Sequence, residues 1–413
     1  MSDIELSSSL HASLSELPTE LMLFIILHLD LPSIKSIRLT CKLLCSLSTP
    51  YLISPTFHFF ANRPDFKRLL NICRHPIFPP CIQSLEFNLG ELNEYHGRHN
   101  IYFSQYMRNA GTHAAEAEDA WLRYSSLRVS SLEYTHLICD LKILSEAFRS
   151  LPNLSSLSVS MTNFPLPSEP VLAILERIWD IPSSRLLRRE LAKERFTNIL
   201  SSILPSVENM KLKNLSHDRL PFEFFAQNKR LMRSMIPIFH NLTDLRFVLD
   251  YSDTPNDLHC AKAFHNISMC LKAAANLQNL NLCFQSRRKV DITLLLKDFL
   301  LDAPGSKYSF PNLRSLHMEG VSSEFHPLAH FLISLAPTLK NLEFGGEGSH
   351  GPNQLANGGI HLLDGKFVQL FKKMEEVVKD PSMRFVIKGD LVEVQGGGSW
   401  FLNREVGWHG VMD

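Results

Sequence analysis

The chain has 413 residues, of which 45% are hydrophobic and 20% charged, a composition typical of a soluble globular protein rather than a disordered one. Its 42 basic residues balance its 42 acidic residues, so no bulk electrostatic field attracts nucleic acid or an anionic membrane. Since it has neither an apolar run long enough to span a bilayer nor a secretory signal, we expect an intracellular protein, in the cytoplasm or nucleus, with no membrane or nucleic-acid partner.

The first predicted element is a group of three short helices, which follows a flexible tail at residues 1–12. The first helix spans Leu17–Leu29, the second begins at Pro32, and the third begins at about Leu39, since Pro suits the first turn of a helix. Apolar residues run nearly all round the first helix, so it needs cover on two sides. The other two helices supply one side. A unit of about 35 residues is too small to bury a self-sufficient core, which leaves the other side for a partner.

This stretch resembles an F-box over roughly residues 13–50. The resemblance rests on the opening LPTEL, on the LPSI turn and on the RLTCK sequence at residues 38–42, and it departs from the usual pattern at Thr40 and Leu44. It implies that the unit binds the Skp-type adaptor of a cullin-based ubiquitin ligase and, through the adaptor, the cullin scaffold. The residues that it assigns to the adaptor contact are Leu17, Pro18, Leu21, Ile25, Leu29, Leu31, Pro32 and Ile34.

Residues 51–80 follow as a connection that prolines interrupt. The segment is rich in Phe and therefore too apolar for a free linker. We expect an ordered connection, with one short helix at Phe66–Cys73, that packs the helical unit against the domain that follows.

From residue 81 a six-residue pattern recurs: apolar, polar, then Ser, Asn or Asp, then Leu or Met, polar, apolar. Its fourth and sixth positions point to one face of an extended segment, and its fifth position points to the other. Helix-period stretches lie between the copies, which indicates strand–helix units with parallel strands. The eight copies are Ile82–Phe87, Val129–Tyr134, Leu154–Val159, Val207–Leu212, Leu242–Phe247, Leu277–Leu282, Leu313–Met318 and Leu339–Phe344.

The pattern is similar to the start of a leucine-rich repeat, L-x-x-L-x-L, with a longer and more uneven period. The predicted fold class is therefore α/β: a small helical F-box, then an irregular leucine-rich-repeat-like βα solenoid with parallel strands over residues 81–413. Two insertions, Glu91–Arg123 and Pro165–Leu204, interrupt the array. A terminal hairpin of Arg384–Lys388 and Leu391–Val394 is expected to cap it. A two-helix repeat of the tetratricopeptide kind is the alternative, but a helix would not confine polar residues to positions two, three and five.

The fifth positions should line the inner, concave face of the sheet and form the surface that binds a target protein. They run from acidic residues at one end to basic residues in the middle, although polar residues there also simply keep a sheet face in contact with water. In chain order they are Glu86, Glu133, Ser158, Lys211, Arg246, Asn281, His317 and Glu343.

Motifs for catalysis or metal binding are weak throughout. His96-x-x-His99 has no carboxylate or cysteine at ligand spacing, and Gly396–Ser399 lacks the order of a nucleophile or phosphate-binding motif. The eight cysteines are scattered, as is typical of reduced thiols. We therefore expect no enzyme, no cofactor and no metal.

The sequence predicts a substrate-receptor subunit of an SCF-type E3 ubiquitin ligase, which holds an unknown protein target near the transfer machinery and contributes proximity. The alternative is an F-box-containing scaffold or signalling protein without a degradative role.

Overall fold

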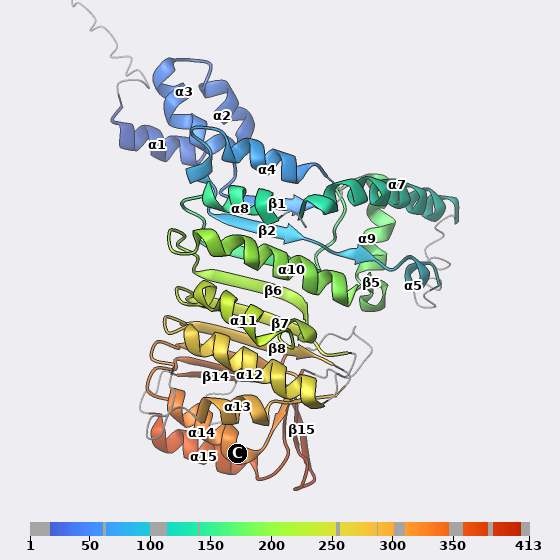
Figure 1. Ribbon diagram of the computed structural model, residues 1–413, viewed down its shortest axis with the longest axis vertical. Coiled ribbons are helices and arrows are strands. Elements are labelled where there is room, and N and C mark those ends of the chain that lie inside the picture. Colours follow the sequence, from blue (N-terminus) through green and yellow to red (C-terminus); the bar gives the residue numbers. More distant parts are fainter. Residues whose placement is uncertain are drawn as a thin grey trace, which may run out of the picture.

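The computed structural model describes residues 17–60, 63–99, 114–138, 141–252, 257–286, 288–300, 310–346, 358–378 and 383–405. The segment predicted as a flexible tail lies outside these ranges. Within them, no helix combines the length and the apolar character that crossing a membrane requires. A small group of helices stands at one end of the molecule, and a stack of strands and helices extends from it to the other end (Figure 1).

Three short helices form the N-terminal helical unit, residues 17–52, close to where the sequence predicts them. They are α1 (Thr19–Leu27), α2 (Leu31–Ile37) and α3 (Lys42–Ser48). Asp30 begins α2, because its side chain accepts a hydrogen bond of 2.9 Å from the backbone N–H of Ser33 and so satisfies a donor of the first turn. Each helix contributes to a small core, whose buried apolar residues are Met22, Ile26, Ile34 and Leu44.

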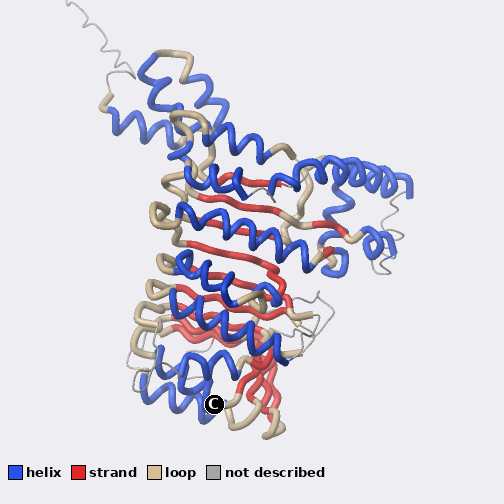
Figure 2. Tube along the Cα trace, in the orientation of Figure 1, coloured by secondary structure: helices blue, strands red, loops and turns tan. Residues whose placement is uncertain are grey.

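The rest of the chain is built on one large sheet, whose parallel strands lie in the order β1-β2-β4-β6-β7-β8-β10-β12-β14. Their bounds are β1 (Thr56–Phe60), β2 (Ser84–Asn88), β4 (Ser156–Ser160), β6 (Asn214–Pro221), β7 (Asp244–Asp250), β8 (Asn279–Gln285), β10 (Ser315–Glu319), β12 (Asn341–Phe344) and β14 (Arg384–Glu393). Helices alternate with the strands along the chain and lie together in a layer beside the sheet (Figure 2). The helices are α4 (Asp65–Cys73), α8 (Leu141–Arg149), α10 (Arg189–Ile203), α11 (Lys229–Met235), α12 (Asp257–Ala273), α13 (Thr293–Leu300), α14 (Phe325–Leu335) and α15 (Phe367–Val377). The predicted α/β class with parallel strands is confirmed, and the architecture is solenoid-like.

The fourth and sixth positions of the repeated pattern supply the core. Leu85 and Phe87 of β2 are each 1% exposed, and the equivalent residues of the other parallel strands are buried as well. Nearly all of them are Leu, Phe, Val, Ile or Met, so their burial under the helices provides the hydrophobic contribution to stability. The one ionisable residue among them is His217 of β6, at a sixth position.

Two of the predicted copies of the pattern are not strands. Val129–Tyr134 lies inside α7 (Ala114–Ile138), a long helix, because a six-residue alternation alone does not distinguish a strand from one turn and a half of helix. Val207–Leu212 precedes β6, and the true copy begins at Leu212, since Leu215 pairs in register with Leu245 of β7. The polar His217 in that copy conceals the pattern.

The two ends of the sheet also differ from the prediction. The first strand, β1, lies in the segment predicted as a connection, and it carries Phe57 at the fourth position, where the other strands of the repeat carry Leu. At the other end β14 is one continuous strand that passes through Gly389 at a φ of 83° rather than turning there. The hairpin instead joins β14 to β15 (Gly398–Glu405), its antiparallel neighbour.

A second, smaller row of strands lies beyond β14 in the same sheet. Its members are β13 (Ile360–Leu362), β11 (Val321–Ser323) and β9 (Val290–Asp291), which follow β12, β10 and β8 in the chain. The late part of β14 pairs with β13, whereas its first part pairs with β12. A group of glycines therefore occupies the bend between the two rows, where Gly320 has a φ of 72° and Gly345 a φ of 78°.

The two predicted insertions meet in a side lobe next to the first strands (Figure 1). Strand β3 (Glu91–Leu92) from the first insertion pairs with β5 (Arg185–Leu186) from the second. The lobe has a separate apolar cluster, in which Trp121 of α7 and Trp179 of α9 (Ala173–Trp179) are each 3% exposed.

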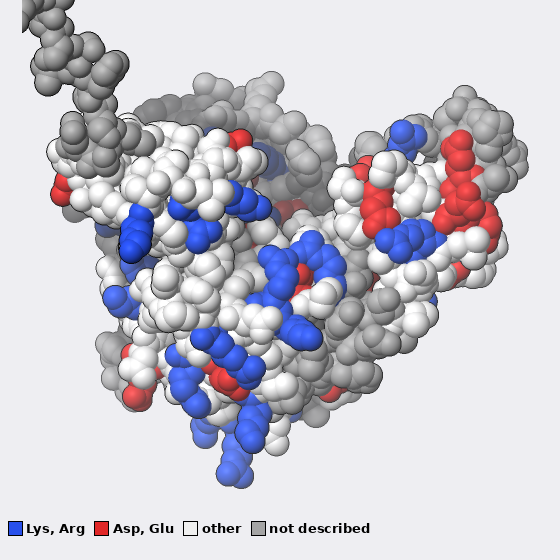
Figure 3. Space-filling model, turned by 90° about the horizontal axis from the view of Figure 1, so that it is seen from above, with Lys and Arg blue, Asp and Glu red and all other residues white. Residues whose placement is uncertain are grey.

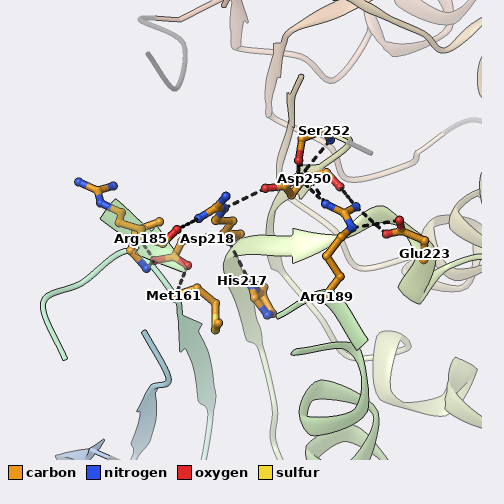
Figure 4. A network of polar contacts seen from close by, with 10 residues as sticks. Met161, Arg185, Arg189, His217, Asp218, Glu223, Asp250 and Ser252 are labelled. Atoms are coloured by element: carbon orange, nitrogen blue, oxygen red, sulfur yellow. Dashed lines mark hydrogen bonds and ion pairs between the residues drawn. The ribbon is translucent and has the colours of Figure 1, made fainter. Parts of the chain in front are cut away.

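A buried polar cluster joins the start of α10 to the carboxyl ends of β6 and β7 (Figure 4). The side chain of Asp250 is 3% exposed and lies 2.7 Å from the guanidinium group of Arg189 and 2.8 Å from that of Arg219. Arg189 also pairs with Glu223 at 2.6 Å. Burial by itself raises the pKa of Asp250, but the charge of Arg219 and the surrounding hydrogen bonds lower the pKa overall, so the carboxylate stays ionised.

The buried imidazole of His217 predicts a loss of stability in mild acid. Burial lowers its pKa from 6.5 to about 4, although the charge of Asp218 acts in the opposite direction. Between these two pH values the unfolded chain takes up a proton that the folded chain does not, so stability falls as the pH falls. For this one group we expect a loss of about 1 kcal/mol in the free energy of unfolding between pH 6 and pH 5.

Urea unfolding at both pH values measures this effect in the wild type and in His217→Asn. The Asn side chain can accept the hydrogen bond that His217 Nδ1 accepts from the backbone N–H of Arg219, but it does not titrate. The substitution should flatten the pH dependence, whereas the same change at the exposed His240 should not. An unchanged slope in His217→Asn would contradict the assignment.

Candidate functional site

Helix α1 is apolar on two sides, only one of which is covered. Met22 and Ile26, one turn apart, are 2% and 1% exposed and form the covered side. Leu21, Phe24 and Leu27 recur every three residues on the other side and are 51%, 61% and 59% exposed. We call these three residues the exposed face of α1. Large apolar side chains that lie next to one another on the surface mark interaction surfaces.

The remaining residues assigned to the adaptor contact divide by burial. Pro18, Leu31 and Pro32 are exposed, and Leu17, Ile25 and Leu29 are half-buried. The resemblance implies that Ile34 also contacts the partner. Ile34 is only 6% exposed, however, and its side chain belongs to the core of the helical unit. The reason is that α2 must bury one apolar residue against its neighbours.

The assignment also omits several exposed apolar residues of the helical unit. Phe24 and Leu27 could have been identified from the sequence, because apolar residues run nearly all round α1. Leu39 lies in the turn after α2 and is 88% exposed. Leu43 of α3 is 43% exposed. Figure 3 views this end of the molecule from above, and broad areas of the surface shown there are formed by residues other than Lys, Arg, Asp and Glu.

The register of the sheet places most of the predicted target-binding residues in one row. The row crosses β1, β2, β4, β6, β7, β8, β10 and β12 at successive Cα partners. It consists of His58, Glu86, Ser158, Ser216, Arg246, Asn281, His317 and Glu343, and we call it the fifth-position row. These side chains are half-buried or exposed and point away from the core.

Two predicted members are elsewhere. Glu133 lies on α7, and Lys211 precedes β6, where Ser216 takes the place predicted for it. The expected change from acidic to basic residues is therefore wrong. Arg246 is the basic residue in the middle of the row, with the acidic residues Glu86 and Glu343 toward the two ends.

Neighbouring members of the row bond to one another across the strands. His58 Nδ1 lies 2.9 Å from Glu86 Oε2, and the Ser216 hydroxyl donates to the Ser158 hydroxyl over 2.8 Å. Such pairs hold the side chains in fixed positions on a rigid sheet.

A hollow of about 330 Å³ lies over the middle of the row, between β6 and β12. Arg246 is an exposed residue of its lining, together with half-buried polar groups. The arrangement provides hydrogen-bond donors and acceptors for a polar segment of another molecule.

The buried thiols of Cys73 and Cys270 have the properties of core residues. Burial raises the pKa of Cys73 and of Cys270 to about 12, so neither is a reactive thiolate at neutral pH. The two histidines His96 and His99 lie on the short helix α5 (Glu94–His99), and His99 Nδ1 is 2.8 Å from the carbonyl oxygen of Tyr95.

A scan against models of protein families finds no match to the chain, and a search among curated proteins finds none either.

Proposed function

We propose that the protein is the substrate-receptor subunit of a cullin-based, SCF-type E3 ubiquitin ligase. In this proposal the helical unit binds the Skp-type adaptor, the adaptor connects it to the cullin scaffold, and the sheet holds a target protein. The protein would act in the cytoplasm or the nucleus, where such ligases assemble. Its contribution is to bring the target and the transfer machinery together.

The observation that carries the proposal is the exposed face of α1. Leu21, Phe24 and Leu27 lie more than half exposed on a helix that begins directly after the LP of the F-box-like sequence. Leaving large apolar side chains in water costs about 1.5–3 kcal/mol each relative to burying them, so a partner that covers them gains binding energy. A small helical unit with an uncovered apolar side is what the resemblance to an F-box implies.

The target surface that we propose is the fifth-position row with its central hollow. The row is polar and built on neighbouring strands, so it can select a partner by hydrogen bonds and charge rather than by bulk apolar contact. Arg246 in the hollow favours a target segment that presents a carboxylate or another anionic group.

Co-purification with a Skp-type adaptor tests the proposal. The wild-type chain should form a complex, and a Leu17→Ala, Pro18→Ala double variant should lose it while it keeps the circular dichroism spectrum and the unfolding midpoint of the wild type. The absence of a complex with the wild type would overturn the adaptor role. A complex that supports no target-dependent ubiquitin transfer in cells would instead favour a scaffold or signalling protein without a degradative role.

A further inference from the structure

Strands β8 and β10 bring three metal-ligand side chains together on the face of the sheet that carries the fifth-position row. Cys283 of β8 and Glu319 of β10 are direct Cα partners, and His317 lies two residues before Glu319. Because side chains alternate along a strand, positions two apart share a face. The thiol, the imidazole and the carboxylate therefore point the same way.

The donor atoms of these three residues all lie within 4.8 Å of one another. A zinc ion binds sulfur at about 2.3 Å and nitrogen or oxygen at about 2.0–2.2 Å, so in tetrahedral geometry two of its donors lie roughly 3.3–3.7 Å apart. Rotations that move the side-chain ends by under about 1 Å would bring all three donors within bonding distance of one ion.

The surroundings fix these side chains and shield them from water. Cys283 is 6% exposed, and the side chains of His317 and Glu319 are 22% and 18% exposed. Asn281 lies beside them: its amide nitrogen is 3.0 Å from His317 Nδ1, and its amide oxygen is 3.0 Å from Cys283 Sγ.

An Asn next to His317 Nδ1 can serve as the outer partner that a metal-bound histidine requires. The amide can present its oxygen to a protonated Nδ1, since the two ends of an Asn amide are interchangeable in shape. The other ring nitrogen, Nε2, is on the side of Glu319, 3.8 Å from its Oε2. It also lies 3.1 Å from the carbonyl oxygen of Gly345, a bond that a metal would replace.

The bend between the main row of strands and the smaller row of β9, β11 and β13 leaves space for the carboxylate of Glu319. A Cβ atom at Gly346 or at Gly358 would collide with the carboxylate oxygens of Glu319. The backbone N–H of Gly346 donates to the carbonyl oxygen of Gly358 over 3.1 Å, so the two glycines form one wall against the Glu319 side chain. At Gly358 a Cβ atom would also collide with the backbone carbonyl group of Gly346, so glycine is required there because of close backbone approach rather than turn geometry.

We propose that Cys283, His317 and Glu319 form a binding site for a divalent transition-metal ion of the zinc class. Sulfur and imidazole donors disfavour Mg²⁺ and Ca²⁺, which prefer all-oxygen sites. On binding, the thiol of Cys283 releases its proton to solvent and binds as the thiolate. Three protein ligands leave a fourth position, which can accept water or a donor from another molecule.

This inference does not depend on the ligase proposal. It differs from the expectation of no metal, which rested on short motifs. The cysteine and the histidine lie on different strand–helix units, and only the pairing of β8 with β10 joins them.

Titration of the purified, chelator-treated chain with Co²⁺ tests the site, since a thiolate–Co²⁺ bond gives a charge-transfer absorption in the near ultraviolet. We expect saturation at one Co²⁺ per chain, displacement by Zn²⁺, loss of the charge-transfer band in Cys283→Ser, and at least tenfold weaker binding in Glu319→Gln. Cys81→Ser, a change at a half-buried cysteine outside the cluster, is the matched control and should behave as the wild type.

His317→Ala provides an independent variant, because Cys283→Ser alters a buried position. Circular dichroism establishes which variants are folded, and binding is compared among those. A wild-type chain that shows no charge-transfer band, or a band that persists unchanged in folded Cys283→Ser or His317→Ala, would overturn the proposal.

Discussion

Replacement of Asp250 by Ala should lower the free energy of unfolding by about 3–5 kcal/mol. Its carboxylate is almost completely buried between Arg189 and Arg219, and it also accepts a hydrogen bond of 3.1 Å from the backbone N–H of Ser252. Without the carboxylate, the two guanidinium groups face each other in a largely water-excluded environment. Urea unfolding followed by circular dichroism measures the loss.

Glu190→Ala is the matched control for this prediction. Glu190 lies in the first turn of α10, next to Arg189, and pairs with Lys193. Its side chain is 82% exposed, so its loss should lower the free energy of unfolding by less than about 1 kcal/mol. Asp250→Asn keeps the shape and removes only the charge, and it should lie between the two. If the free energy of unfolding of Asp250→Ala lies within about 1 kcal/mol of the wild-type value, as expected for the control, the cluster does not stabilise the junction of α10 with the sheet.

The second large effect concerns the exposed face of α1 and rests on the proposed adaptor role. Leu21→Ala or Phe24→Ala should weaken binding of a Skp-type adaptor by about 2 kcal/mol, which is roughly a 30-fold rise in Kd. Stability should hardly change, because these side chains are 51% and 61% exposed. Calorimetric titration with the purified adaptor gives the affinities, and thermal unfolding gives the stabilities.

A control of equal exposure is available on another helix. Leu294 of α13 is also 51% exposed, so Leu294→Ala removes a comparable apolar group away from the helical unit. Its affinity for the adaptor should equal that of the wild type. Equal losses in Leu294→Ala and Leu21→Ala would show that the contact is unspecific.

The sequence predicted the strand–helix array where local pattern and burial agree. Leu245 and Phe247 of β7 illustrate this: they are two residues apart, both apolar and both buried. Prediction failed where residues break the local rule. His217 shifted the apparent copy by five residues. In β1, Thr56 and Phe57 occupy the third and fourth positions, which the pattern limits to Ser, Asn or Asp and to Leu or Met, so the first strand was missed.

Features that depend on contacts between distant segments could not be predicted. The side lobe requires β3 to pair with β5, and the Cys283–His317–Glu319 cluster requires β8 to lie beside β10. For α1, the sequence indicates that two sides need cover, but only the packing of α2 and α3 decides which side stays exposed. This is why Ile34 was assigned to a partner although it belongs to the core.

Hydrogen exchange with and without a Skp-type adaptor shows whether the exposed face of α1 is the surface that binds the adaptor. The adaptor should slow amide exchange in α1 and in the neighbouring segment up to Leu43, while exchange in the strands from β2 to β12 stays unchanged. Binding without protection of α1, or with protection concentrated on the fifth-position row, would contradict the proposed role of α1.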